Sequence, residues 1–180
     1  MATITKDQIV RIWDVEARKE VRGFVSYMDD MSREFFSLDC KKLAIIDVMG
    51  SMRIVDIETR KEVASLKLSA DSIKSILFSP DGQKLLIRSR SGVVYIWDIK
   101  KRKRIVTLAG HIDWLNSPVF SPDSKKLLGL NNVNIVCLWD AETGKELAKF
   151  EDNMLDRIEG MIFLEDCELF ATISKSHTVK

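Results

Sequence analysis

The sequence predicts an all-β protein made of repeated four-stranded antiparallel sheets. Two observations predict it. A Trp-Asp pair recurs at an interval of 42 residues, and a Phe-Ser-Pro-Asp turn recurs at the same interval between the pairs. Short apolar stretches with strand spacing lie between these marks, and no helix is expected between repeats. Because one four-stranded sheet cannot bury both of its faces alone, the sheets are expected to stack on one another.

The Trp-Asp marks close the third strand of each repeat. They are Trp13-Asp14, Trp97-Asp98 and Trp139-Asp140, with Val55-Asp56 on the same interval in place of a fourth. A short polar segment then reverses the chain. Gly144 stands in the last of these segments where a hairpin loop needs a positive φ, which glycine adopts without penalty. The matching arginines, Arg18, Arg60 and Arg102, either adopt it at a cost or use another turn.

The second recurring turn has the composition of a type I turn, with serine first, proline second and glycine fourth. It occurs as Phe78-Ser79-Pro80-Asp81-Gly82 and Phe120-Ser121-Pro122-Asp123-Ser124, with weaker copies ending at Cys40 and Cys167. An apolar strand follows each copy. In the third repeat the expected strands are Ile73–Phe78, Lys84–Ile87, Val93–Trp97 and Ile105–Leu108.

These motifs, together with Gly110-His111, resemble those of the WD-repeat (beta-transducin-like) β-propeller family over nearly the whole chain. The resemblance implies a propeller of about four blades, each blade being one four-stranded sheet. It also implies a non-catalytic scaffold for protein–protein interaction, without a cofactor or a metal. The structural motif residues would be Trp13, Asp14, Trp97, Asp98, His111, Trp139 and Asp140.

In this family a histidine, a hydroxyl residue, an aspartate and the tryptophan often form a hydrogen-bonded chain within a blade. That network is incomplete in every repeat here. Thr3, Asp7 and Trp13 fit its later part, whereas His111 faces Gly129 and Val133 at the hydroxyl and carboxylate positions. Since a buried unpaired polar group costs about 1–3 kcal/mol, we expect His111 to be partly solvated or bonded elsewhere.

The chain reads as a single repeat array over residues 1–180. We expect a partial blade at 1–25, full blades at about 26–68, 69–110 and 111–152, and a partial blade at 153–180. Since the family usually closes with about seven blades, the favoured interpretation is an incomplete propeller, a fragment of a larger propeller protein. The alternative is a closed four-bladed ring, in which strands near 157–173 pair with strands near 8–25. An open arc would expose strand edges and an apolar face, which favours self-association.

The composition limits the classes of binding partner and the cellular compartment that we expect for this chain. The net charge of +1 argues against nucleic acid and anionic membranes as partners. Three cysteines without a close pair, Cys40, Cys137 and Cys167, suit free thiols in a reducing compartment. We expect no signal peptide, and no apolar run reaches the roughly 18 residues of a membrane span. The expected location is the cytoplasm, with the nucleus as the alternative.

Several residues resemble catalytic or binding groups only in type. His111 and His177 are too far apart in repeat register to act together, and no metal-ligand or triad spacing surrounds them. The equivalent aspartates Asp29, Asp71, Asp113 and Asp156 occur one per blade, which suits turn capping. The basic run 100–104 is interpreted as a solvated hairpin tip. An enzyme with a propeller-borne site and an inactive gene fragment remain as alternative hypotheses.

The expected partner-binding face carries the loops before the first strand and between the second and third strands of each blade. Its residues are Asp30, Ser72, Lys74, Arg90, Trp114, Asn116, Asn132 and Arg157. Trp114 is the best anchor, because a large aromatic at a blade entrance suits an interaction hot spot. The mixed character of the residues favours a protein or a peptide as the partner.

Overall fold

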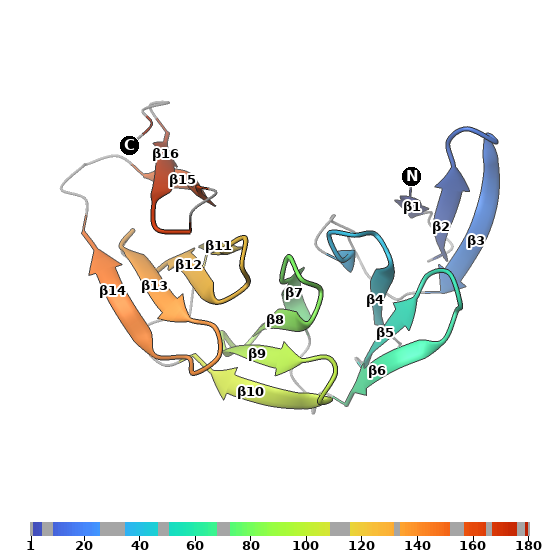
Figure 1. Cartoon of the computed structure of the whole chain (residues 1–180), viewed down its shortest axis with the longest axis horizontal. Coiled ribbons are helices and arrows are strands. Elements are labelled where there is room, and N and C mark those ends of the chain that lie inside the picture. Colours follow the sequence, from blue (N-terminus) through green and yellow to red (C-terminus); the bar gives the residue numbers. More distant parts are fainter. Residues whose placement is uncertain are drawn as a thin grey trace. The chain divides into compact units, whose positions relative to one another are not determined.

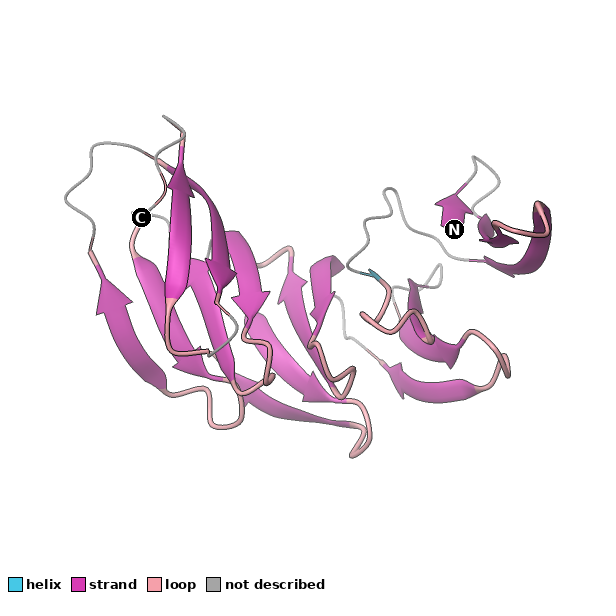
Figure 2. Ribbon diagram, turned by 45° about the horizontal axis from the view of Figure 1, so that its top comes forward, coloured by secondary structure: helices cyan, strands magenta, loops and turns pink. Residues whose placement is uncertain are grey.

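The structure is a computed structural model, and it describes ten stretches of the chain. These are residues 2–4, 9–25, 35–46, 51–67, 73–108, 116–131, 134–151, 157–164, 167–175 and 179. Over these residues the chain forms sixteen β-strands and no helix beyond a single 3₁₀ residue, Phe35. Figure 2 shows the strands joined by turns. None of the described residues lies in a helix with the length and hydrophobicity of a membrane span. The all-β prediction is confirmed.

The chain divides into two compact units, Met1–Ser72 and Ile73–Lys180, and each is described by itself. The first unit holds two antiparallel sheets, with strand orders β1-β2-β3 and β4-β5-β6. Their strands are β1 (Ala2–Ile4), β2 (Ile9–Asp14), β3 (Lys19–Val25), β4 (Lys42–Ile46), β5 (Met52–Asp56) and β6 (Glu62–Leu66). Phe36 forms an isolated antiparallel bridge with Leu43, on the side of β4 where the predicted first strand of that blade would pair.

The second unit holds two four-stranded sheets and one two-stranded sheet, all antiparallel (Figure 1). The strands are β7 (Ile73–Phe78), β8 (Lys84–Ser89), β9 (Val94–Asp98), β10 (Lys103–Thr107), β11 (Asn116–Phe120), β12 (Lys126–Leu130), β13 (Val136–Asp140), β14 (Glu146–Phe150), β15 (Ile158–Phe163) and β16 (Phe170–Ser174). The four strands predicted for the third repeat are all present. The fourth starts earlier than expected, at Lys103, because it pairs with Asp98 directly after the turn.

The two four-stranded sheets share one hydrophobic core. Its members from β7–β10 are Leu86, Val94, Ile96 and Leu108, and those from β11–β14 are Phe120, Leu127, Cys137, Trp139 and Ala141. A second core joins β11–β14 to β15–β16 through Leu128, Leu130, Val136, Ile158, Met161 and Phe163. Each large aliphatic side chain buried in this way contributes about 1.5–3 kcal/mol. The expected stacking of sheets is therefore present within this unit.

Strand β12 explains why the predicted second strands are apolar without alternation. Leu127 faces the β7–β10 sheet, whereas Leu128 and Leu130 face the β15–β16 sheet. Successive side chains of a strand point to opposite faces, so a strand covered on both sides must be apolar at every position. Strand β12 is therefore buried by a neighbouring sheet on each face.

The predicted turns have the expected geometry. In the Ser-Pro-Asp turns the N–H of the fourth residue donates to the carbonyl of the first, as in Gly82 to Ser79 (2.8 Å) and Ser124 to Ser121 (2.8 Å). The serine hydroxyl donates to the aspartate two residues on, at 2.5 Å in Ser79–Asp81. The fourth residue has a positive φ in all four copies, which include Cys40 and Cys167 at 56° and 58°. These two cysteines adopt a conformation that costs glycine nothing.

Gly144 has the predicted positive φ of 68°, and the matching arginines adopt it as well. Arg18, Arg60 and Arg102 have φ values of 52°, 61° and 53°. The sequence left open whether these arginines adopt a positive φ or use another turn. They adopt the positive φ, at a cost in conformational energy. At Gly144 a Cβ would in addition lie 2.2 Å from a methyl group of Val106, so glycine is required there by space as well.

The strand pairing that a closed four-bladed ring requires is not found among the described residues. The ring required residues 157–173 to pair with residues 8–25, but β15–β16 and β1–β3 are separate sheets in the described part of the chain. The two segments instead repeat the same local pairing. Ile173 forms an antiparallel bridge with Val179, and Ile4 pairs with Val10 in the same way.

Candidate functional site

One end of the strands in the second unit carries the predicted binding residues that the structure describes. Ile73 pairs with Ser89, so the start of β7 and the end of β8 lie together. Lys74 comes directly after Ile73, and Arg90 comes directly after Ser89. Both are exposed, and they therefore lie at the same end of the sheet. In the next sheet Asn116 pairs with Leu130 at the equivalent end. We call this end of the second unit the loop face.

Arg157 joins the loop face at the start of β15. Its side chain is exposed, and its carbonyl accepts the N–H of Lys175 (2.8 Å), which follows β16. Lys175 is also exposed, so two basic side chains lie side by side at this point of the face. The sequence did not predict Lys175 as a residue of this face, because its position depends on the register between β15 and β16.

An asparagine-rich loop between β12 and β13 orders the middle of the loop face. The Asn131 Oδ1 accepts the N–H of Ile135 (2.9 Å), which closes the loop on itself. The Asn134 Oδ1 accepts the N–H of Ile158 (3.0 Å), which ties the loop to the first residue of the neighbouring sheet. Asn134 has a φ of 65°, a conformation that asparagine tolerates. The sequence predicted Asn132 in this loop as a binding residue but did not predict Asn131 or Asn134.

The loop between β8 and β9 places hydroxyl groups on the same face. The Ser89 and Ser91 hydroxyl oxygens lie 2.7 Å apart, and Ser89 Oγ accepts the N–H of Val93 (3.1 Å). Gly92 has a φ of 90°, which glycine adopts readily, so the backbone can form this tight turn. Hydroxyl, amide, ammonium and guanidinium groups thus gather on one end of the sheets. Such groups suit hydrogen bonds to the backbone and polar side chains of a peptide.

Four of the predicted face residues fall outside the described residues: Asp30, Ser72, Trp114 and Asn132. The same holds for His111, His177 and the aspartates at 29, 71, 113 and 156. Their predicted roles stay predictions. In the described part of the chain, no group of three or more His, Cys, Asp or Glu side chains could hold a metal ion.

Burial, with the nearby Glu146 carboxylate, raises the pKa of the Cys137 thiol.

The aspartates of the Trp-Asp marks lie at the opposite end of the strands and cap the turns that follow. The carboxylate of each accepts the N–H three residues on, from Ala17, Thr59, Lys101 and Thr143 at 2.7–2.8 Å. The N–H of Thr143, aided by its hydroxyl, holds the pKa of Asp140 below its ordinary value. The recurring aspartate is thus explained by the turn it closes.

The tryptophans of these marks differ in their hydrogen bonds. Trp13 Nε1 donates to Thr3 Oγ1 at 2.8 Å, as the sequence predicted. The indole N–H groups of Trp97 and Trp139 are buried and have no acceptor in the described residues. Ile87 and Gly129 stand two and three intervals after Thr3, at the hydroxyl position of these blades. The blades of Trp97 and Trp139 therefore lack the hydroxyl that would accept the indole N–H, as expected from an incomplete network.

Comparison with known families agrees with this geometry. Residues 60–98 match the family model of the WD domain, G-beta repeat. These residues therefore form one WD repeat. No curated protein sequence matches it. The matched WD repeat comprises β6 from one sheet and β7, β8 and β9 from the next, so the sequence repeat is staggered against the sheets. The small antiparallel sheets of two to four strands are consistent with an incomplete WD propeller.

Proposed function

We propose that this WD-repeat protein is a non-catalytic scaffold that binds a protein or peptide through the loop face. WD repeats generally form interaction surfaces, which supports the class of function. The observation that carries the site is the exposure of Lys74, Arg90 and Arg157 at one end of sheets that pack on one another. The Asn134–Ile158 bond ties the β12–β13 loop to the start of β15 beside Arg157, and a surface fixed in this way loses less entropy on binding.

The test is affinity capture with substitutions on and off the loop face. The Arg157→Ala and Trp114→Ala variants should each reduce partner recovery by about tenfold or more, as hot-spot residues do. Arg60→Ala is the matched control, because Arg60 is also an exposed arginine but lies in the β5–β6 turn at the other end of its strands. Equal recovery with all four proteins would reject the loop face as the binding surface.

We also propose that the exposed face of β15–β16 binds a second copy of the chain. Ile162, Ile173 and Val179 are 55%, 42% and 66% exposed. Their equivalents one repeat earlier, Val119, Leu130 and Val136, pack in the core between β11–β14 and β15–β16. Sedimentation velocity should show a concentration-dependent dimer or larger species, and Ile162→Glu should remove it. A monomer at every concentration would contradict self-association.

The proposed location is the cytoplasm. None of the three cysteines forms a disulfide bond, which supports a reducing compartment. Fluorescence of a fusion protein should be cytoplasmic, and exclusive secretion or nuclear accumulation would contradict this proposal.

A further inference from the structure

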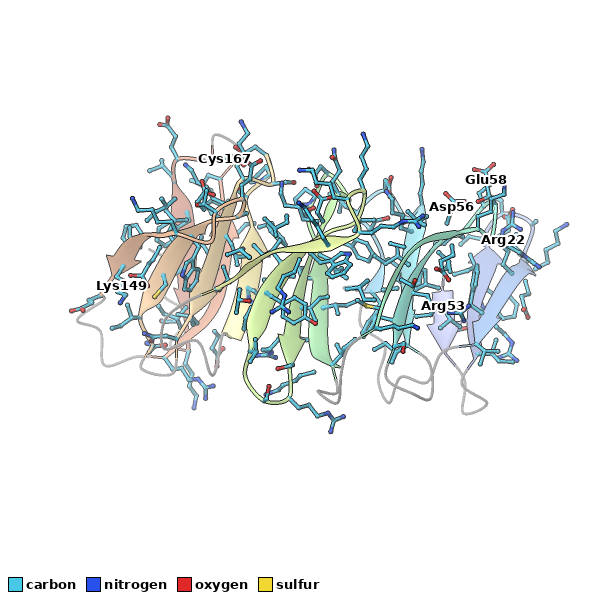
Figure 3. The ribbon with its side chains drawn as sticks, turned by 90° about the horizontal axis from the view of Figure 1, so that it is seen from below. Arg22, Arg53, Asp56, Glu58, Lys149 and Cys167 are labelled. Atoms are coloured by element: carbon cyan, nitrogen blue, oxygen red, sulfur yellow. The ribbon has the colours of Figure 1, made fainter. Side chains whose placement is uncertain are left out.

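The β9–β10 turn has the opposite charge from its sister turns. Residues 98–104 carry five basic side chains and one carboxylate, a net charge of +4. The turns at 14–20 and 56–62 each carry two basic and three acidic side chains, a net charge of −1, and the turn at 140–146 carries −2. Figure 3 shows Asp56 and Glu58 together at the β5–β6 turn. Since the whole chain has a net charge of +1, the β9–β10 turn is a local concentration of charge.

Most of this charge is available to solvent. All five basic residues, 100–104, are exposed. The Lys101 ammonium lies 3.4 Å from the Asp98 carboxylate. Lys100, Arg102 and Lys103 form no ion pair in the described part of the chain. Three exposed cations of this turn are therefore not neutralised by a carboxylate of the described residues.

The sheet accommodates the reversed charge through a specific contact. In the first sheet, Arg11 on β2 pairs with Glu20 on β3, with Nε and Oε2 3.4 Å apart. Two repeat intervals later the same positions hold Tyr95 and Arg104, and the guanidinium lies 5.3 Å from the centre of the tyrosine ring. A cation over an aromatic face replaces the ion pair. The reversal is thus matched by a second change across the sheet.

Backbone strain does not distinguish this turn. Arg102 has a positive φ, but Arg18 and Arg60 share that conformation in turns of net charge −1. What is particular to the β9–β10 turn is the replacement of the flanking acidic side chains. Lys100 and Arg104 stand where the β5–β6 turn has Glu58 and Glu62.

We propose that the β9–β10 turn is a docking surface for an acidic segment of a partner protein. Carboxylates of such a segment would pair with Lys100, Arg102 and Lys103 in charge-assisted hydrogen bonds. A single nucleic-acid strand fits less well, because stacking needs an exposed aromatic face and Tyr95 is buried beneath Arg104. The surface is separate from the loop face, because β9 runs from one to the other.

The repeats supply a matched variant. Lys100→Glu, Lys101→Thr and Arg104→Glu together convert residues 98–104 into the sequence of residues 56–62. The resulting turn already exists in this chain with a Thr59–Asp56 hydrogen bond of 2.8 Å, so the substituted turn has a known way to fold. The probe is a fluorescently labelled glutamate-rich peptide, and the measurement is its polarisation on titration with the full chain.

The wild-type chain should bind the peptide, and the three substitutions should weaken binding by about tenfold. The reciprocal change, Glu58→Lys, Thr59→Lys and Glu62→Arg, made in the weakened variant, should restore binding. If the triple variant loses its folded circular dichroism spectrum, Lys100→Glu with Lys101→Thr keeps Arg104 on Tyr95 and should still weaken binding.

Equal binding by the wild type and a folded variant would overturn the proposal. So would tighter binding of a labelled oligonucleotide of the same charge than of the peptide, because the partner class would then be nucleic acid. Loss of peptide binding in the turn variants with normal capture through the loop face would show that the two surfaces act separately.

Discussion

Trp13 and Trp139 occupy the same repeat position and are held in different ways. Trp13 is partly exposed and donates a hydrogen bond to Thr3. Trp139 is 1% exposed and packs in the core between two sheets, with an indole N–H that has no acceptor in the described residues. At Trp139, burial of the ring holds the side chain in place without a hydrogen bond to a described residue. Where a neighbouring sheet covers the ring, burial alone retains it.

Removing the covered ring is the largest expected effect and would break the comparison. Trp139→Ala should destabilise the second unit by about 3–5 kcal/mol, because it empties the core between β7–β10 and β11–β14. Trp13→Ala should cost less, because its ring is already partly in water. Urea unfolding followed by circular dichroism measures both. An equal loss from the two substitutions would contradict the difference in packing.

Restoring the missing acceptor should sharpen the comparison. Gly129→Thr places a hydroxyl at the position that Thr3 has in the first sheet, and it should stabilise the chain by about 1 kcal/mol relative to Gly129→Val. The valine variant is the control, because it has the same shape and β-propensity without the hydroxyl. If both variants unfold at the same urea concentration, the indole N–H of Trp139 is not costly and this reading is wrong.

The converse substitution in the first sheet should have a similar or smaller effect. Thr3→Val removes the acceptor of the Trp13 indole and should cost about 0.5–1 kcal/mol, because water can reach part of this ring. Thr3→Ser retains the hydroxyl and serves as the control. The expected order of urea midpoints is wild type and Thr3→Ser above Thr3→Val, and the reverse order would count against the bond.

The smallest expected effect is a pH dependence in the turn that follows Trp139. The N–H of Thr143 lowers the pKa of Asp140 in the folded chain from its ordinary value of 3.8. Its contribution to stability is therefore present above pH 3.8 and is lost as the pH falls through the lowered pKa. Asp140→Asn should reduce the loss of unfolding free energy on acidification by less than about 0.5 kcal/mol. Identical unfolding profiles between pH 5 and pH 2 would show that the cap contributes nothing.

The sequence was sufficient for features that repeat and insufficient for features that join repeats. The strands, the Ser-Pro-Asp turns, the positive φ of Gly144 and the Thr3–Trp13 pair follow from local patterns at a fixed interval. The hydrogen bond from Ile158 to Asn134 was not predicted. Nor were the bonds from Lys84 Nζ to the Ser124 carbonyl (3.1 Å) and from Lys126 Nζ to the Cys167 carbonyl (2.9 Å).

These missed contacts have one physical cause. Each links two sheets whose relative position is set by the packing of their cores, and a local pattern does not encode that distance. The same limit applies to the candidate site. The pattern identified Lys74, Arg90 and Arg157 by their place in each repeat. Lys175 reaches the loop face only through the register of β15 with β16, and the bond from Ile158 to Asn134 depends on the packing of β15 on β11.

Hydrogen exchange of the indole N–H groups, followed by NMR after ¹⁵N labelling of tryptophan, tests the stacking of the sheets most directly. Trp13→Phe and Trp139→Phe variants assign the signals. The Trp139 N–H should exchange far more slowly than the Trp13 N–H, although only Trp13 has a hydrogen-bond acceptor among the described residues. Exchange of Trp139 at the rate of a free indole would contradict the account, because the β7–β10 sheet would then not cover β11–β14.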